Sequence, residues 1–586
     1  MNLQSLDWII IAAFFAVTMI IGIWSSKKAG KSAKDFFLSG RDMPWWLLGV
    51  SMVATTFSAD TPNLVTDIIR KNGVAGNWVW WAFLLTGMTT VFIYAKLWRR
   101  SGILTDLEFY EMRYSGKEAA FLRGFRAIYL GVFFNVMIMA TVMLAGIKIA
   151  GVMLGISPIQ TVLLVSFVTV LYSSLGGLRG VMLTDFFQFF LSMIAMIIGA
   201  VYVVRLPEVG GLDKLLSHPN VVGKLDMFPD FNDMNIAIPL FFIPIAVQWW
   251  SAWYPGAEPG GGGYIAQRML SAKEEKDAVR ATLFFNLAHY ALRPWPWILI
   301  ALASLIIFPS LDSIAASFPN VDKSIINDDL AFPAMLSLLP SGLLGLIIAA
   351  LTAALMSTIS THLNWGASYI VNDFYVRFIE NAASDKQQVL IGRIATVVLM
   401  VLAAFFSLGL ESALGAFQIL LQIGAGTGLL FLLRWFWWRI NAYSEIAAMV
   451  VSFALAIYFE MFYSGGLESW ERMCLAVLIT TVCWVGATFL TRPTDINTLQ
   501  DFFQRIRPHK FGWSPVVQKL KKDGKELPII KDQSFTNELL MLFLGCIMIY
   551  CLLFGVGYVI YGNTMLGSVC VLVSFLSGFF LTRLWR

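Results

Sequence analysis

"LLGLIIAALTAALMSTISTHLNWGASYI", residues 343–370, contains no aspartate, glutamate, lysine or arginine. An α-helix crosses the hydrocarbon core of a bilayer with about 20 such residues, so this run predicts a membrane-spanning helix. Its middle carries four hydroxyls within five positions, and unpaired polar groups in hydrocarbon cost several kcal/mol each. The hydroxyl cluster therefore needs partners inside the membrane; it comprises Ser357, Thr358, Ser360 and Thr361.

Similar apolar runs recur along the whole chain of 586 residues, which is 58% hydrophobic and 13% charged with a mean hydropathy of +0.71. A soluble protein carries about 25% charged residues. A membrane β-barrel would show short alternating strands instead of these long runs. The sequence predicts an all-α polytopic membrane protein with about fifteen spans: 6–25, 44–69, 76–97, 123–151, 158–176, 183–204, 236–256, 280–308, 341–371, 388–408, 412–435, 441–462, 472–490, 537–560 and 564–583.

Basic residues concentrate in alternate connections. The connection after the first span holds five Lys/Arg, the one after the third holds seven, and 491–536 holds nine, whereas 309–340 has only Lys323. The positive-inside rule predicts an external N-terminus and a cytoplasmic C-terminus in a cell membrane. The N-terminal segment has no basic region and no cleavage site, so we interpret it as a retained helix. The net charge of +5 then reports topology and does not predict nucleic-acid binding.

Enzyme signatures are missing from the sequence. It has four histidines without an HExxH motif, no phosphate-binding Gly-rich loop of the ATPase type, and five cysteines without metal-binding spacing. We therefore expect no enzymatic activity and no structural metal.

Two stretches predict interruptions of helices. "FSADTPNL", 57–64, places Pro62 and Asp60 within the second span, and "YPGAEPGGGGYIAQR", 254–268, holds two prolines and five glycines at the seventh. Irregular backbone at membrane depth is tolerated only where it lines a cavity or is buried in protein. Broken spans at corresponding positions of two halves point to a transporter binding site.

The hydroxyl cluster suits a small monovalent cation, which binds hydroxyl oxygens together with carbonyls freed at a helix break. The carbonyls near Ala59 and Pro62 are candidates for the second part of such a site. Alternatively, the hydroxyls bond to carbonyls of their own helix or join neighbouring helices.

Other polar residues stand alone in apolar spans. Asp185 follows a glycine-rich turn and is either a helix N-cap or a cation ligand. The charged tail of "GGYIAQRMLSAKEEKDAVRA", which follows Tyr264, is most simply a solvated cytoplasmic helix, and the tryptophans of 76–83 are more typical of an interface belt than of a sugar-stacking surface. Ionisable and amide groups inside the membrane are functional hypotheses; they are Asn135, His289, Arg293, His362 and Gln422.

Several ordered motifs resemble the sodium:solute symporter family, which includes sodium/galactose, sodium/proline and sodium/sialic acid transporters. The resemblance covers residues 5–490, and the motifs are "MPWWLLGVSMVATTFSAD", "DLEFYEMRYSG", "SLGGLRGVMLTDFFQ", "YIAQRMLSAK" and "AALMSTISTHLN…VNDFY". It implies a LeuT-type inverted repeat of five plus five helices within 41–436. The other predicted regions are an extra helix and basic loop (1–40), two flanking helices (437–491), a basic connection (492–536) and two C-terminal helices (537–586).

The resemblance also implies ligands for sodium, the one expected cofactor ion. The main sodium site maps onto backbone carbonyls and two adjacent hydroxyls of Ala59, Pro62, Ala354, Ser357 and Thr358. Members with a second sodium hold it through residues that match Asp185, Ser360 and Thr361.

Substrate positions match the family less closely. Asn135 matches an asparagine of the sugar transporters, but their sugar-binding lysine matches His289 and a polar residue of span three falls near Trp80. Gln422 and Asp60 complete the expected substrate residues, and Tyr264 and Phe417 match the inner and outer gates.

The sequence thus predicts sodium-coupled import of a small organic solute, with a sugar or sugar derivative favoured, by alternating access. Amino acid or carboxylate uptake and a transporter-like membrane sensor are the alternatives. The expected partners are the solute, sodium ions and the lipid bilayer.

Overall fold

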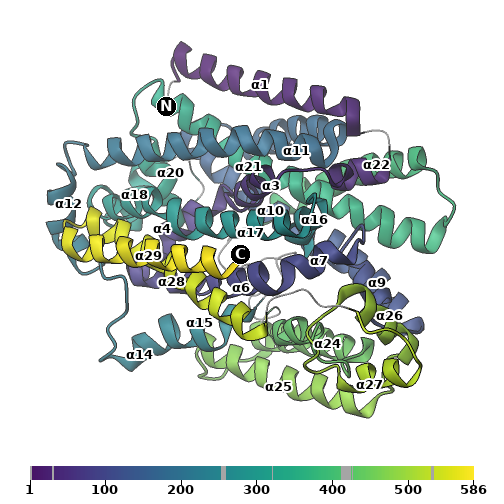
Figure 1. Ribbon diagram of the computed structural model, residues 1–586. Helices are drawn as coiled ribbons and strands as arrows, with labels where there is room; N and C mark the ends of the chain where they lie inside the picture. Colours follow the sequence, from purple (N-terminus) through teal and green to yellow (C-terminus); the bar gives the residue numbers. More distant parts are fainter. Residues whose placement is uncertain are drawn as a thin grey trace.

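The computed structural model describes residues 3–29, 32–251, 259–319, 321, 323–410, 424, 426–528 and 534–585. Every regular element assigned within these ranges is a helix. One isolated β-bridge joins Met43 to Ala272. Long helices cross the molecule side by side, and short ones connect them (Figure 1). The all-α class predicted from composition is confirmed.

Eleven helical segments are long and apolar enough to cross a membrane, and each corresponds to one of the fifteen predicted spans. Three further predicted spans correspond to shorter apolar helices, at Trp45–Thr56, Pro158–Ser174 and Met234–Ala246. The predicted span 412–435 begins in residues outside the described part of the chain. The eleven segments are Ser5–Ser25, Val74–Ser101, Lys117–Met153, Gly176–Val204, Glu275–Ile307, Leu343–Ile379, Asp385–Ser407, Ala442–Phe462, Ser469–Leu490, Phe535–Ile560 and Thr564–Trp585.

The second span is broken, as predicted. Helix α3 (Trp45–Thr56) ends before Phe57, and α4 (Asp60–Asn72) begins three residues later. Pro62 lies in the first turn of α4. Backbone N–H groups there have no partner within the helix, so the N–H that proline lacks is not missed. The break therefore frees main-chain groups of both helices in the interior of the protein.

The seventh predicted span is also interrupted. Helix α16 (Gly263–Ser271) starts after Gly260 and Gly261, whose positive φ angles of 83° and 85° suit a residue without a β-carbon. The Trp98 indole fixes this turn by donating to the Gly260 carbonyl at 2.8 Å.

Helix α16 is enclosed in the protein, and the charged tail, which was predicted to be a solvated helix, follows it from Lys273. Every residue of α16 is buried, and the chain reaches the surface only at Lys273. The helix packs against α3, α21 and α7 (Ala95–Ser101), which encloses its polar side chains within the protein.

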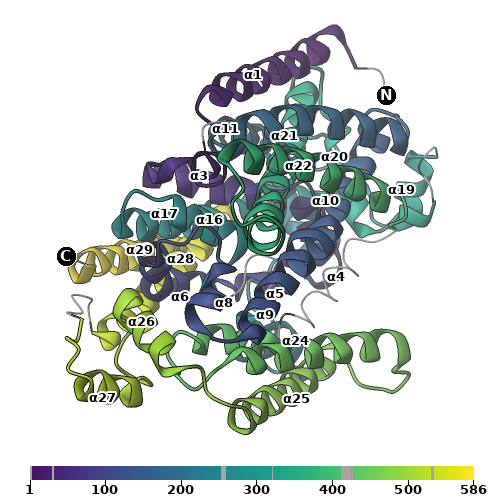
Figure 2. The ribbon, with the colours of Figure 1, turned by 90° about the vertical axis from the view of Figure 1, so that its right-hand side faces the viewer.

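Helix α21 (Leu343–Ser368) lies at the centre of the molecule. It packs against α3, α10 (Asn135–Met153), α11 (Pro158–Val204) and α22 (Asp385–Ser407), and it continues as the π-helical segment η10 (Tyr369–Ile379). Helix α1 (Ser5–Ala29) runs along the outside of α11 (Figures 1 and 2). The Asp7 carboxylate of α1 accepts from the Gly342 and Gly345 amides at 2.7 and 2.8 Å, which places a negative charge at the N-terminus of α21.

The two C-terminal helices, α28 (Phe535–Ile560) and α29 (Thr564–Trp585), form a hairpin packed on the core. The Trp295 indole of α18 (Pro294–Ile307) donates to the Leu553 carbonyl at 3.0 Å, and the Tyr550 hydroxyl donates to the carbonyl of Trp81 in α5 (Trp78–Trp81) at 2.8 Å. Helices α24 (Ala442–Ile457) and α25 (Ser469–Leu490) form another pair, seen at the lower edge of Figure 2.

Candidate functional site

The hydroxyl cluster of α21 faces the break between α3 and α4. Thr358 donates its hydroxyl hydrogen to the Thr55 carbonyl of α3 at 2.8 Å and to the Ala354 carbonyl at 3.2 Å. Thr55 is in the last turn of α3, two residues before the break. A hydroxyl that donates to a carbonyl keeps lone pairs, so the Thr358 oxygen can still accept a cation.

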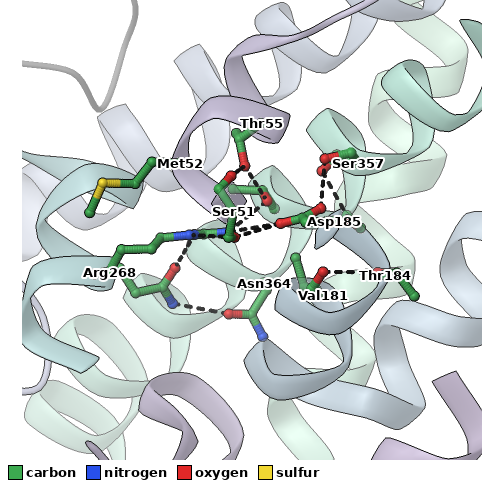
Figure 3. Close-up of polar contacts among 12 residues, drawn as sticks. Ser51, Met52, Thr55, Val181, Thr184, Asp185, Arg268, Ser357 and Asn364 are labelled. Atoms are coloured by element: carbon green, nitrogen blue, oxygen red, sulfur yellow. Dashed lines mark hydrogen bonds and ion pairs between the residues drawn. The ribbon is translucent and has the colours of Figure 1, made fainter. Parts of the chain in front are cut away.

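Ser357 points to a different helix. Its hydroxyl donates to the Asp185 carboxylate at 2.6 Å, and Ser51 of α3 donates to the other carboxylate oxygen at 2.6 Å (Figure 3). Asp185 is completely buried inside α11, whose N-cap is Ser157, so the N-cap interpretation of Asp185 is wrong. The carboxylate joins α3, α11 and α21.

Arg268 of α16 lies between Asp185 and Thr361. The guanidinium donates to the Thr361 hydroxyl at 2.8 Å and to Ser51 at 3.3 Å, and it is 3.9 Å from the Asp185 carboxylate (Figure 3). Asp185 and Thr361 are two of the three residues predicted to hold a second sodium, and both contact this cation. Sequence reasoning missed Arg268 because its burial depends on α16 returning into the core after the glycine-rich turn.

The remaining predicted sodium ligands differ in their surroundings. Ser360 donates to the carbonyl of Ser357 at 3.0 Å, the bond within its own helix that was the alternative to ion binding. Ala59 is fully buried as the residue that precedes α4, and Pro62 is buried in the first turn. Ala59 therefore lies at the break and Pro62 just after it, while Thr358 contacts the end of α3 on the other side of the break.

A cavity lies beside this break, and we refer to it as the solute cavity. Four predicted substrate or gate residues line it: Asp60, Trp80, Tyr264 and His289. Thr55 also lines it, so one residue borders both the solute cavity and the candidate sodium site. The other lining residues are Thr56, Ser58, Thr61, Leu64, Val65, Phe83, Tyr290 and Arg293.

Aromatic rings form one wall of the solute cavity. The Trp80 ring stacks on Tyr290 at 5.9 Å between centroids, and His289 meets Trp80 edge-on at 5.8 Å. The Trp80 indole nitrogen donates to Asn77 at 2.8 Å, which fixes the ring. The interface-belt interpretation is therefore wrong for Trp80, which is buried against the cavity.

Asn135 joins two helices and is not part of the cavity wall. Its amide nitrogen donates to the His362 carbonyl at 2.8 Å, and its oxygen is 2.5 Å from the His362 ring nitrogen Nδ1. These bonds join α10 to α21, and Asn135 does not line the solute cavity. The predicted residues Gln422 and Phe417 lie outside the described part of the chain.

Comparison with known proteins shows the family of this chain. The family model "Sodium:solute symporter family" matches residues 36–452. A sodium/glucose cotransporter of Vibrio parahaemolyticus is 27% identical over 85% of this chain and 92% of its own length, and a sodium/mannose cotransporter of Bos taurus is 26% identical over 78% of each.

A solved structure of a Na⁺-coupled sialic acid symporter in a substrate-bound outward-open state shares the fold. The TM-score is 0.68 at 20% identity, over 84% of this chain and 99% of that one. This similarity confirms the predicted LeuT-type core. The chain is a multi-pass membrane protein and a sodium-coupled transporter without enzymatic function, and it belongs to the sodium:solute symporter family.

Proposed function

We propose that this protein imports a sugar or sugar derivative together with sodium, and that sodium binds between the broken second span and α21. The observation that carries this proposal is the bond from the Thr358 hydroxyl to the Thr55 carbonyl, because Thr55 also lines the solute cavity. The similarity to sodium/glucose and sodium/mannose cotransporters favours a sugar over an amino acid.

In the proposed main site, sodium is held by the Ser357 and Thr358 hydroxyls together with carbonyls of Ala59, Pro62 and Ala354. Hydroxyl and carbonyl oxygens suit a hard monovalent cation. A bound ion fixes α21 against the end of α3 and thereby fixes Thr55 in the cavity wall. Sodium binding would in this way prepare the cavity for the solute, which is a thermodynamic coupling that works in both directions.

The solute then binds near the membrane midplane, between the aromatic wall and the helix break. Tyr264 closes the inner side of the cavity in this proposal. Inward opening separates α3 from α21, which loosens the sodium site and releases both ligands.

For the orientation we propose an external N-terminus and a cytoplasmic C-terminus. The support is the concentration of Lys and Arg in alternate connections. In this orientation the cell's sodium gradient and membrane potential both drive import.

One sodium supplies enough energy for a steep solute gradient. Moving it through ~100 mV yields about 2.3 kcal/mol, and a tenfold sodium gradient adds about 1.4 kcal/mol. For a neutral solute these add up to about 3.7 kcal/mol, which sustains a gradient of several hundredfold at about 1.4 kcal/mol per factor of ten. A monoanionic solute carried with one sodium moves no net charge, so it would draw on the sodium gradient alone.

Uptake by proteoliposomes that contain the full chain tests the proposal. We expect saturable uptake and counterflow of at least one labelled sugar or sugar derivative with an inward sodium gradient, and loss of both when choline replaces sodium. Sodium-driven uptake of amino acids alone would refute the sugar assignment, and sugar uptake that is equal in choline would refute sodium coupling.

A further inference from the structure

Arg293 is a buried cation in the wall of the solute cavity. It precedes α18, one helical turn after His289, and its side chain is 1% exposed. One terminal nitrogen donates to the Val53 carbonyl at 3.3 Å and to the Thr56 hydroxyl at 3.2 Å, and the other is 2.6 Å from His289 Nδ1. The carbonyl and the hydroxyl are neutral and the histidine is never negative, so none of the three partners supplies a negative charge.

Among the described residues, no carboxylate lies within ion-pair distance of Arg293. Its nitrogen Nε has no hydrogen-bond partner there either, and its charge is covered by the Phe57 and Trp297 rings at 5.8 and 5.1 Å. Two other buried arginines differ, since Arg268 is 3.9 Å from Asp185 and Arg434 is 3.4 Å from Glu445. The Asp60 carboxylate across the cavity attracts Arg293, but no hydrogen bond or ion pair joins the two. The guanidinium therefore keeps N–H groups, such as Nε, that a ligand anion can bind.

Across the same cavity, two groups favour a ligand with hydroxyls. Asp60 Oδ1 and the Ser58 hydroxyl are buried without a hydrogen-bond partner among the described residues. A carboxylate oxygen accepts from ligand hydroxyls, and the Trp80–Tyr290 wall offers aromatic faces to a ring. The cavity thus combines a cation, a hydrogen-bond acceptor and an aromatic surface.

We propose that the solute is a sugar acid, a polyhydroxylated molecule with one carboxylate, and that Arg293 binds this carboxylate. This inference rests on the proposed function, because it specifies the solute of the same cavity. The sugar hydroxyls donate to Asp60 and exchange hydrogen bonds with Ser58, while the ring lies against Trp80. Arg293 suits this role because its planar fork matches a carboxylate.

The test compares neutral sugars with their acids on the purified full-length protein in sodium. Glucose with glucuronate and galactose with galacturonate are matched pairs, since each differs at one carbon; gluconate, N-acetylneuraminate and a set of amino acids complete the panel. We expect a thermal shift or titration to show at least tenfold tighter binding of one acid than of a neutral sugar, and loss of that binding in choline.

The variants Arg293→Gln and Arg293→Lys connect the preference to this residue. Arg293→Gln should reduce the acid-to-neutral affinity ratio at least tenfold, and Arg293→Lys should retain part of it because the charge stays. Arg113→Lys is the matched control, because Arg113 is also fully buried but donates to main-chain carbonyls away from the cavity.

Each result decides the matter. Tighter binding of neutral sugars than of every acid would overturn the inference and leave sodium–sugar symport standing, and binding of amino acids alone would overturn both. If Arg293→Gln does not fold, the wild-type panel and Arg293→Lys still decide, because an acid preference that Arg293→Lys and Arg113→Lys weaken equally would refute the role of Arg293.

Discussion

At the scale of single residues, the Asp185 carboxylate of α11 contacts polar side chains from three other helices. It accepts from Ser51 of α3 and Ser357 of α21, and the Arg268 guanidinium of α16 lies 3.9 Å away. All four side chains are buried, so water does not screen the charges. The network therefore holds α16 and α11 to the helices that form the proposed sodium site.

Removing one charge of this pair should destabilise the protein more than removing both. Asp185→Asn or Arg268→Gln alone leaves an uncompensated buried charge, at a cost of about 3–5 kcal/mol. We expect the double variant to be more stable than the sum of the single effects predicts. Apparent Tm values in detergent for the complete double-mutant cycle measure this coupling.

Additive losses in that cycle would show that Asp185 and Arg268 do not interact. The pair Glu526→Gln and Arg205→Gln serves as an additive control, because both residues are exposed.

The sequence indicated the hydroxyl cluster but not its partners. Four hydroxyls in an apolar run are visible as a pattern, and their contacts with Thr55 and Asp185 confirm that they need polar partners. Arg268 could not be predicted in the same way, because an arginine before a charged segment is usually solvated. Its burial depends on the path of α16, which no local pattern specifies.

At the scale of the element, α21 depends on close approach to its neighbours. Gly366 faces α10, and a β-carbon there would collide with the Asn135 amide and lie 2.7 Å from the Gly131 carbonyl. The small residue permits the Asn135–His362 bonds that join the two helices.

Gly366→Ala should therefore destabilise the protein by about 1–3 kcal/mol, the usual cost of overpacking. Gly151→Ala in α10 is the control, because a β-carbon there meets nothing within 4 Å and alanine favours a helix. Thermal unfolding in detergent should show a lower Tm for Gly366→Ala only. Equal Tm values for the two variants would contradict this packing.

The C-terminal end of the α21–η10 helix is attached through Glu111 of α8 (Glu108–Arg113). The carboxylate contacts Arg377 of η10 at 2.7 Å and Arg123 of α9 (Lys117–Ile128) at 2.8 Å. Burial acts to raise the pKa of Glu111, but the hydrogen bonds and charges of Arg377 and Arg123 outweigh it, so the pKa is lowered.

Because this pKa is lower in the folded state, Glu111 stabilises the protein above its ordinary pKa of about 4.3, and this contribution is lost as the pH falls through the folded value. Glu111→Gln should cost about 1 kcal/mol at pH 7, since the group is partly exposed. The difference in Tm from wild type should shrink below about pH 4.3. A difference that does not change with pH would contradict the ion pairs, and exposed Glu526→Gln is the control.

At the scale of the whole molecule, composition and span lengths were sufficient to predict an all-α membrane protein. The break at 57–59 was also predictable, because Pro62 and Asp60 mark it. The lengths of the other helices were harder to predict. The predicted span 158–176 continues into α11, which is kinked at Gly177, and α16 is far shorter than a membrane span. Their lengths depend on packing against α3 and α21, which are distant in the sequence.

Binding of radioactive ²²Na⁺ to the purified full-length protein tests the central claim most directly. The proposed site between the α3–α4 break and α21 predicts saturable binding by wild type, with at least tenfold weaker binding by the Ser357→Ala/Thr358→Ala double variant and near-normal binding by Thr358→Ser. Sodium affinity in the double variant equal to that of wild type would contradict it.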